Sequence, residues 1–266
     1  MKGLKIVVLA KQVPDTRNVG KDAMKADGTV NRAALPAIFN PEDLNALEQA
    51  LRLKDTIEGT TVHVLTMGPG RAAEIIREAM YRGADGGYLL SDRAFAGSDT
   101  LATSYALSCA LRNLEYDLIV CGRQAIDGDT AQVGPQIAEK LDLPQVTYVE
   151  EFHIDDNLKD ITVKRQLEDG YELIAIKTPC MLTAIKELNE PRYMNMKGIF
   201  GEKDIKIWNA KDIEVDLTKV GLEASPTNVF RSFTPAPKAP GQVIAGDSEN
   251  EQAKNLLIQL KGKHII

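Results

Sequence analysis

The sequence predicts an α/β protein, built on a mostly parallel, doubly wound sheet with added antiparallel strands and a C-terminal arm. Over the first two-thirds of the 266 residues, short apolar runs alternate with helical patterns, an order that gives a parallel sheet covered on both faces. From about residue 147 strand-like runs follow one another directly, which is typical of an antiparallel meander. After residue 225, prolines and glycines break regular structure. We therefore expect an α/β domain over residues 1–224 and a proline-rich arm over residues 225–266 that docks on a partner.

Four buried strands are expected in the first part of the domain. Residues 4–10 read Leu-Lys-Ile-Val-Val-Leu-Ala, a largely apolar run with a polar turn after it. Similar runs occupy residues 61–67, 88–90 and 118–121. Parallel sheets bind ligands beyond the carboxyl ends of their strands, where the strand order reverses. The segments that follow these runs are therefore the candidates for a site.

Helices are expected between the strands. The run Asn40-Pro41-Glu42-Asp43 has the features of a helix start, because asparagine can cap, proline suits the first helical position and acids favour the positive end of the dipole. Apolar residues at helical spacing predict further helices over residues 72–80, 98–114 and 133–141, and a last one over residues 249–260.

The antiparallel meander is expected from three alternating runs, at residues 152–154, 161–166 and 171–176, which turn residues separate. The dipeptide Asp27-Gly28 is typical of a hairpin turn.

Composition and charge exclude several classes of protein. The chain is 44% apolar and 26% charged, so it is not a disordered protein, and its formal net charge of −6 argues against nucleic-acid binding. It has no apolar run of about 20 residues, and its first residues do not resemble a secretory signal, so we expect a cytoplasmic protein that does not enter membranes. Three widely spaced cysteines indicate neither disulfides nor a zinc site.

The most informative segment is residues 121–135, Cys-Gly-Arg-Gln-Ala-Ile-Asp-Gly-Asp-Thr-Ala-Gln-Val-Gly-Pro, between an expected strand and an expected helix. Free backbone N–H groups at such a position can bind a phosphate. Gly122 and Gly128 let the backbone approach a ligand closely. Thr130 can donate to a phosphate oxygen, and Gln132 can pair with an adenine edge or a ribose.

Two carboxylates in this segment act against a diphosphate. Asp127 and Asp129 repel it, so backbone amides and Arg123 must attract it, while the acids cap the helix or bind ribose hydroxyls. The alternative is a capped helix after a glycine turn, with no ligand.

Two further segments follow expected strands and could line the same adenosine pocket. They are Asn40-Pro41-Glu42-Asp43 and Thr66-Met67-Gly68-Pro69. Each alone is better explained as a helix cap or a turn. Their positions at strand ends of a single sheet favour the pocket.

Catalytic motifs are absent from the sequence. No GxGxxG follows the first expected strand, and no GxSxG, P-loop or HExxH occurs. We therefore expect no catalytic acid, base or nucleophile, and we expect Cys121 to pack in the core.

The segment 192–198, Arg-Tyr-Met-Asn-Met-Lys-Gly, carries two methionines and a tyrosine outside any clear period. Methionine is an adaptable contact residue, so an exposed loop of this kind suits partner docking. The alternative is a loop folded back on the core.

At these residues the chain resembles the beta subunit of electron transfer flavoproteins, over essentially its whole length. The resemblance is carried by residues 7–13 (Val-Val-Leu-Ala-Lys-Gln-Val), Asn40-Pro41, and residues 51–54, 83–85, 122–134 and 188–193. The pattern Gly-Arg-Gln-Ala-Ile-Asp followed by Asp and Gln is highly specific for that family.

The resemblance implies a fold like that of adenine-nucleotide hydrolases and a larger alpha subunit that holds an FAD. It implies that the C-terminal arm wraps on the alpha subunit. It implies nucleotide contacts from Leu9, Asn40, Pro41, Glu42, Asp43, Met67, Gly122, Arg123, Gln124, Ala125, Ile126, Asp127, Gly128, Asp129, Thr130, Ala131, Gln132 and Val133. It further implies that Arg192, Tyr193, Met194 and Met196 dock an acyl-CoA dehydrogenase, with Met196 as the apolar anchor.

The bound nucleotide differs within the family. The beta subunit binds structural AMP in the housekeeping branch and a second FAD in the electron-bifurcating branch. Gly128 and the pair Thr130-Ala131 are smaller here than the residues that the AMP branch places there, so the resemblance favours FAD. The implied reaction takes two electrons from NADH and sends one to ferredoxin or flavodoxin and one to the alpha-subunit flavin. Structural AMP is the alternative.

Arg165, in an expected antiparallel strand, could reach the alpha-subunit flavin; the alternative is a surface salt bridge. Two other kinds of function remain open: an adenosine-binding subunit without a redox cofactor, and a free-standing nucleotide-hydrolysing or stress-type protein. The missing P-loop and base argue against the latter.

Overall fold

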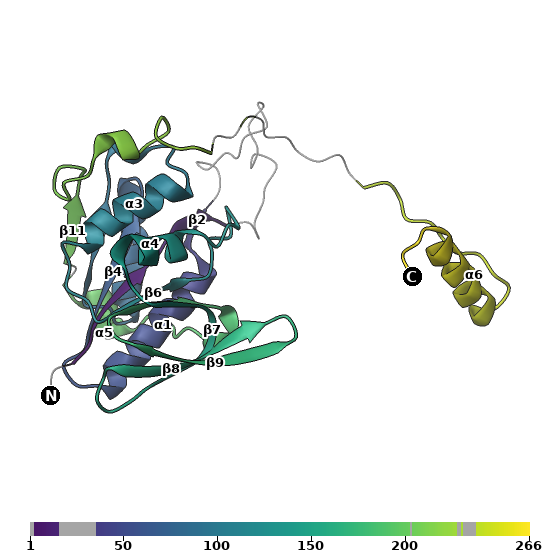
Figure 1. Ribbon diagram of the computed structural model, residues 1–266, viewed down its shortest axis with the longest axis horizontal. Helices are drawn as coiled ribbons and strands as arrows, with labels where there is room; N and C mark the ends of the chain where they lie inside the picture. Colours follow the sequence, from purple (N-terminus) through teal and green to yellow (C-terminus); the bar gives the residue numbers. More distant parts are fainter. Residues whose placement is uncertain (1–2, 16–35, 203, 228–229, 231–237) are drawn as a thin grey trace. The chain divides into compact units, whose positions relative to one another are not determined.

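The computed structural model describes residues 3–15, 36–202, 204–227, 230 and 238–266 (Figure 1). The chain divides into two compact units, Met1–Arg231 and Ser232–Ile266. The hairpin turn predicted at Asp27-Gly28 lies outside the described residues. Among the described helices, none combines the length and the apolar character that a membrane span requires.

A nine-stranded sheet forms the centre of the first unit, in the order β11-β5-β4-β1-β6-β10-β7-β8-β9. Its strands are β1 (Lys5–Leu9), β4 (Thr61–Met67), β5 (Gly86–Leu90), β6 (Leu118–Gly122), β7 (Gln145–Ile154), β8 (Asp160–Leu167), β9 (Gly170–Lys177), β10 (Cys180–Ala184) and β11 (Ile205–Trp208). Pairing is parallel from β11 to β7 and antiparallel from β7 to β9. The predicted fold class and meander are confirmed.

Two strands of this sheet, β10 and β11, have no counterpart in the sequence-based expectation. The strand β10 lies between β6 and β7, so the meander is joined to the parallel strands through it. It follows β9 with only two residues between them and no helix, and a five-residue apolar run gives no period by which to recognise it. A second, two-stranded sheet of β2 (Gln12–Pro14) and β3 (Ala37–Phe39) was also not predicted.

Within the first unit, helices cover both faces of the central sheet. Six α-helices are described in all. They are α1 (Pro41–Thr56), α2 (Ala73–Arg82), α3 (Thr100–Leu111), α4 (Val133–Leu141), the short α5 (Met196–Phe200) and, in the second unit, α6 (Glu249–Gly262). Short 3₁₀ turns cover Gly70–Ala72, Arg93–Phe95, Lys186–Leu188 and Leu217–Lys219. Ser248 caps α6 by accepting from the backbone N–H of Glu251 at 3.3 Å.

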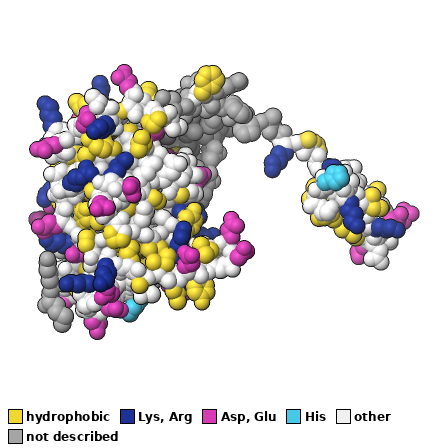
Figure 2. Space-filling model, in the orientation of Figure 1, with side chains coloured by type: hydrophobic (Ala, Val, Ile, Leu, Met, Phe, Trp, Pro, Cys, Tyr) yellow, Lys and Arg dark blue, Asp and Glu magenta, His cyan; other side chains and the backbone are white. Residues whose placement is uncertain are grey.

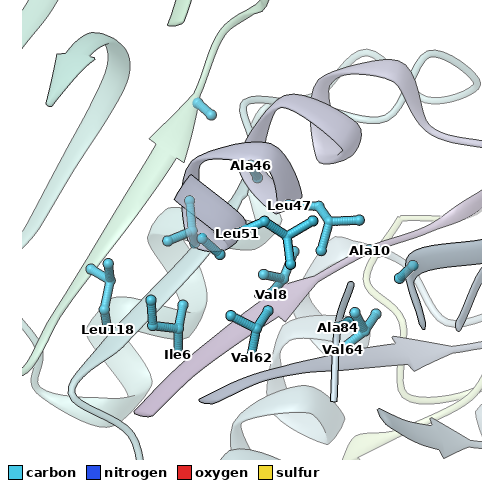
Figure 3. Packing of buried hydrophobic residues seen from close by; sticks show 14 of the residues in the cluster. Ile6, Val8, Ala10, Ala46, Leu47, Leu51, Val62, Val64, Ala84 and Leu118 are labelled. Atoms are coloured by element: carbon cyan, nitrogen blue, oxygen red, sulfur yellow. The ribbon is translucent and has the colours of Figure 1, made fainter. Parts of the chain in front are cut away.

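The alternation of β1 divides the core into two clusters. Ile6 and Val8 belong to the cluster under α1, where Leu47 and Leu51 pack over the sheet (Figure 3). Val7 and Leu9 belong to the cluster under α3 and α4. These two helices lie side by side (Figure 1). The chain runs outward from β1 through β4 to β5 and then continues with β6 on the other side of β1, so the strand order reverses between β1 and β6. A crevice opens beyond the carboxyl ends of strands at such a reversal.

Candidate functional site

A cavity of about 390 Å³ lies at the carboxyl ends of β1, β4 and β6, where the topology predicts a ligand site. This volume is within the range of small-molecule sites, roughly 300–1,000 Å³. Its lining includes most of the expected nucleotide contacts: Leu9, Asp43, Met67, Gly122, Arg123, Gln124, Ala125, Gly128, Asp129, Thr130, Ala131, Gln132 and Val133. That these residues contact a nucleotide stays a prediction.

Five expected contacts do not line the cavity: Asn40, Pro41, Glu42, Ile126 and Asp127. Two of them, Asn40 and Glu42, support the loop between β6 and α4 instead. The Asn40 amide donates to the backbone oxygen of Gln124 at 2.9 Å and accepts from the backbone N–H of Ile126 at 3.1 Å. Glu42 accepts from the backbone N–H of Gln124 at 3.1 Å. The first turn of α1 therefore shapes the loop that lines the cavity.

The expected helix cap at Asn40 is wrong in detail. Asn40 precedes α1, but its side chain makes no capping hydrogen bond. The loop after β6 engages the amide oxygen and one of the amide N–H groups of Asn40. A sequence pattern for a cap cannot reveal this, because the competing partners are more than 80 residues away.

Asp43 is a fully buried carboxylate that joins two strand ends. It accepts from the backbone N–H of Lys11 at 2.8 Å and from that of Gly122 at 2.9 Å. Burial raises the pKa of Asp43 to about 7, although these hydrogen bonds and one from Asn40 act to lower it. Asp43 therefore lines the cavity and also holds together the two backbone segments at its edge.

The glycine at 122 is needed for packing against α1. A Cβ there would lie 2.5 Å from Oδ1 of Asp43 and 2.8 Å from its backbone nitrogen. A close approach between two protein segments therefore accounts for this glycine, and that its backbone also approaches a ligand stays a prediction. Gly128 is different, because a Cβ there would meet nothing within 4 Å, and it leaves space in the cavity wall.

The N-terminus of α4 opens on the cavity. Gln132, Val133 and Gly134 all line it, and the Gln132 side chain makes no capping hydrogen bond to the helix. It accepts instead from the Thr100 hydroxyl at 2.8 Å. Helix N-termini with free N–H groups favour anions. The first turn of α4 can therefore offer backbone N–H donors to an anion, and that these bind a phosphate stays a prediction.

The N-terminus of α3 also borders the cavity, through Ser98, Asp99, Thr100 and Thr103. Here Asp99 accepts from the backbone N–H of Ala102 at 3.0 Å and caps the helix. A capped end with a carboxylate is a poor anion site, so a phosphate fits α4 better than α3. The sequence analysis missed this side of the cavity, because nothing local distinguishes these residues from an ordinary helix start.

The two cationic side chains of the cavity lining, Arg123 and Lys11, each form an ion pair. Arg123 forms an ion pair with Glu42 at 2.9 Å and lies 5.5 Å from the Tyr148 ring centroid. Lys11, which the sequence analysis did not select, lines the cavity and pairs with Asp127 at 2.6 Å. Its position directly after the first strand was the available signal. The ion pair with Lys11 lowers the repulsion that Asp127 would exert on an anion.

Two residues of the loop have left-handed backbone conformations, Asp129 with φ 50° and Ala131 with φ 52°. Such conformations are unfavourable for residues other than glycine, by roughly 1–2 kcal/mol each, and they concentrate at functional sites. Cys121 is buried, and burial raises its pKa well above the ordinary value. Among the described residues, no group of side chains is arranged to hold a metal ion.

Arg165 lies on β8 and is not among the residues that line the cavity. It pairs with Glu172 on β9 at 3.4 Å, which is the salt bridge that the sequence analysis left as its alternative. Its Nε is buried without a hydrogen-bond partner.

On the face seen in Figure 2, cationic and anionic side chains are interspersed.

The 192–200 loop, as we call residues 192–200, lies on the side of α1 and α2. Tyr193 is 91% exposed, Met196 66% and Phe200 79%, and Met194 is also exposed. Arg192 instead forms ion pairs with α1. The loop therefore presents apolar side chains to solvent from an anchored base.

Comparison with known proteins agrees with this geometry. The model of the electron transfer flavoprotein domain matches residues 27–213. The chain is 53% identical over 266 residues to the caffeyl-CoA reductase-Etf complex subunit CarD of Acetobacterium woodii and 51% identical over 266 residues to the electron transfer flavoprotein subunit beta of Thermoanaerobacterium thermosaccharolyticum. It is 47% identical over 273 residues to the acryloyl-CoA reductase electron transfer subunit gamma of Anaerotignum propionicum. Each match covers 99% of this chain and 100% of the relative. The chain therefore belongs to the electron transfer flavoprotein family, among its beta subunits.

Proposed function

We propose that this chain pairs with an alpha subunit to form a heterodimeric electron transfer flavoprotein and binds FAD in its cavity. With its partner it takes electrons from NADH and delivers them by bifurcation to a low-potential acceptor, ferredoxin or flavodoxin, and to an acyl-CoA dehydrogenase. The alternative is a non-bifurcating carrier subunit that holds structural AMP.

The observation that carries the proposal is the cavity at the reversal of strand order, with the uncapped N-terminus of α4 in its wall. In this arrangement the backbone N–H groups of Val133 and Gly134 bind a phosphate. Thr130 adds a hydroxyl donor. The apolar side chains of Leu9 and Met67, from the ends of β1 and β4, pack against the rest of the ligand.

Two features of the cavity favour FAD over AMP. Gly128 leaves open space where a larger residue would narrow the cavity. A second cavity of about 330 Å³ shares Lys11 and Met67 with the first, so a ligand longer than a mononucleotide has room to continue. The names of two relatives also place them in CoA-reductase systems, which supports an acyl-CoA dehydrogenase as an electron acceptor.

The chemistry of electron transfer comes from the cofactor: a bound flavin supplies two-electron uptake and one-electron release. The protein binds and orients the flavin and tunes its redox potential. Arg165, with one unpartnered nitrogen, is our candidate for a contact with the alpha-subunit flavin. The C-terminal arm, whose α6 exposes Leu256, Leu257 and Ile258, is our candidate for docking on the alpha subunit. Arg192, Tyr193, Met194 and Met196 are our candidates for docking the dehydrogenase, Arg192 through its hold on the loop.

The test is to express both subunits together and to analyse the released ligands by visible spectroscopy and mass spectrometry. We expect two FAD molecules per heterodimer. Gly128→Glu should remove the flavin of the beta subunit, because it places bulk and a carboxylate in the cavity, whereas Gly128→Ala should retain it. Gly128→Gln separates the effect of volume from that of charge. One flavin with one AMP would contradict the FAD proposal and support the alternative.

A further inference from the structure

A buried carboxylate on α1 holds the base of the 192–200 loop. Glu48 is only 5% exposed and lies in the third turn of α1. It accepts from the Arg192 backbone N–H at 3.1 Å, from its Nε at 2.8 Å and from its NH2 at 3.2 Å. Arg52, one turn further along the helix, donates a fourth hydrogen bond at 2.9 Å. Although burial acts to raise it, the pKa of Glu48 is lowered by the hydrogen bonds from the two arginines.

Further hydrogen bonds to α1 and α2 hold the base of the 192–200 loop. Asn189 and Asn45 exchange amide–backbone hydrogen bonds of 2.7 and 3.0 Å, and Arg82 on α2 donates to the Arg192 carbonyl oxygen. Further along, the Asn195 N–H donates to the Tyr81 backbone oxygen at 2.9 Å. Both α1 and α2 therefore fix the start of the loop.

The end of the loop also packs against the protein, but apolar side chains of the loop stay exposed. A Cβ at Gly198 would lie 2.4 Å from the Tyr81 backbone oxygen, so α5 is pressed against the end of α2. Nevertheless Tyr193, Met196 and Phe200, which we call the apolar tip, remain largely exposed. An apolar tip on a rigid base is the arrangement of a preorganised docking surface, which binds without losing the entropy of loop ordering.

We propose that Glu48 is a positioning residue for partner docking: through Arg192 it fixes the orientation in which the 192–200 loop presents its apolar tip. This inference rests on the proposed docking of an acyl-CoA dehydrogenase. An ion pair between a buried carboxylate and a partly exposed arginine adds little to stability compared with apolar packing, so stability alone does not account for a carboxylate at this point. Its bidentate bond to a planar guanidinium does fix an orientation, which a lysine or an apolar pair would not.

The test uses the complete heterodimer, with an acyl-CoA dehydrogenase that it reduces as the titrated substrate. Glu48→Gln keeps the size of the side chain but turns a donor toward the donors of Arg192. We expect the KM for the dehydrogenase to rise about tenfold, which equals roughly 1.4 kcal/mol, with kcat and flavin content unchanged. Arg52→Gln removes the Glu48 partner that lies on α1 itself, and Glu74→Gln makes the same charge change at an exposed position of α2. Both controls should leave the KM unchanged.

Two further readouts separate positioning from general damage. In a double-mutant cycle, Met196→Ala should raise the KM less in the Glu48→Gln background than in the wild type, because both act through the same tip. Amide hydrogen exchange over residues 193–200 should be faster in Glu48→Gln, with the rest of α1 protected as before. If Glu48→Gln fails to fold, Arg192→Lys, which keeps the charge and loses the bidentate bond, replaces it.

Additive effects in the cycle, or unchanged exchange in the loop, would overturn this inference while leaving the proposed function intact. A wild-type heterodimer whose rate does not depend on the dehydrogenase would overturn the proposed docking itself, and the inference with it.

Discussion

Asp43 and Gly122 are joined across 79 residues of sequence by a 2.9 Å hydrogen bond from the glycine N–H to the carboxylate. The second oxygen of the carboxylate accepts from the N–H of Lys11 at 2.8 Å. One side chain of α1 thus fixes the ends of β1 and β6, the two strands between which the cavity opens.

The contact at Gly122 predicts a large effect from a single methyl group. Gly122→Ala places a Cβ 2.5 Å from the Asp43 carboxylate, so α1 or β6 must shift, and we expect the free energy of unfolding to fall by about 1–3 kcal/mol. Urea unfolding measures this. Gly128→Ala, with no atom within 4 Å of the new Cβ, should stay within about 0.5 kcal/mol of the wild type. Equal effects at the two glycines would contradict the close approach.

The buried carboxyl of Asp43 predicts a pH dependence. Its pKa rises from 3.8 in the unfolded chain to about 7 in the folded protein, so the folded state holds the proton more tightly. Its contribution to stability is present below about pH 4 and is lost as the pH rises toward 7. We expect the stability of the wild type relative to Asp43→Asn to fall over this interval, by a total on the order of 4 kcal/mol.

Chemical unfolding of both proteins at several pH values measures this difference, and the comparison removes the titration of all other groups. A difference that is constant from pH 4 to 8 would show that Asp43 is ionised throughout and that its hydrogen bonds outweigh the effect of burial.

The uncapped end of α4 predicts opposite effects on stability and binding. Gln132→Glu keeps the shape of the side chain and its bond from Thr100 but adds a negative charge at the helix N-terminus. The helix should gain about 0.3–1 kcal/mol, whereas the affinity for an anionic nucleotide should fall, most strongly at low salt.

Gln136→Glu, on the same helix, is the matched control. Gln136 accepts from the Ser104 hydroxyl at 2.9 Å but does not line the cavity. Thermal unfolding gives the stability, and titration of the nucleotide-depleted protein with FAD and with AMP gives the affinity. Equal loss of affinity in both variants would argue against a phosphate at the start of α4.

The exposed tip of the 192–200 loop predicts a loss of function without a loss of stability. Met196→Ala removes a side chain that is 66% exposed, so the free energy of unfolding should change by less than about 0.5 kcal/mol. Electron transfer to the dehydrogenase should become slower at limiting partner concentration. Leu217→Ala, at an exposed leucine outside the loop, should change neither, and a similar loss in that control would point to a nonspecific effect.

The parts of the fold that the sequence predicts are those with local causes. The strand at β1 and the helix of α1 follow from apolar period and from Pro41 and its acidic neighbours, and they appear close to the expected positions. The loop after β6 was recognisable because glycines, a threonine and a helix start coincide there. Its place at the cavity then follows from the order of the strands.

The parts that the sequence does not predict depend on distant partners. Nothing near Asn40 indicates that its amide binds the loop 84 residues later instead of capping its own helix. The role of Glu48 is equally hidden, because Arg192 lies 144 residues away. Lys11 and the start of α3 join the site only through the packing of the sheet.

The most direct test of the account is the nucleotide content of the purified heterodimer, measured as flavin per protein by absorbance and as released ligand by mass spectrometry. The account predicts two FAD molecules per heterodimer, one of them lost in Gly128→Glu. A heterodimer with one FAD and one AMP, or with no nucleotide that depends on residue 128, would contradict it.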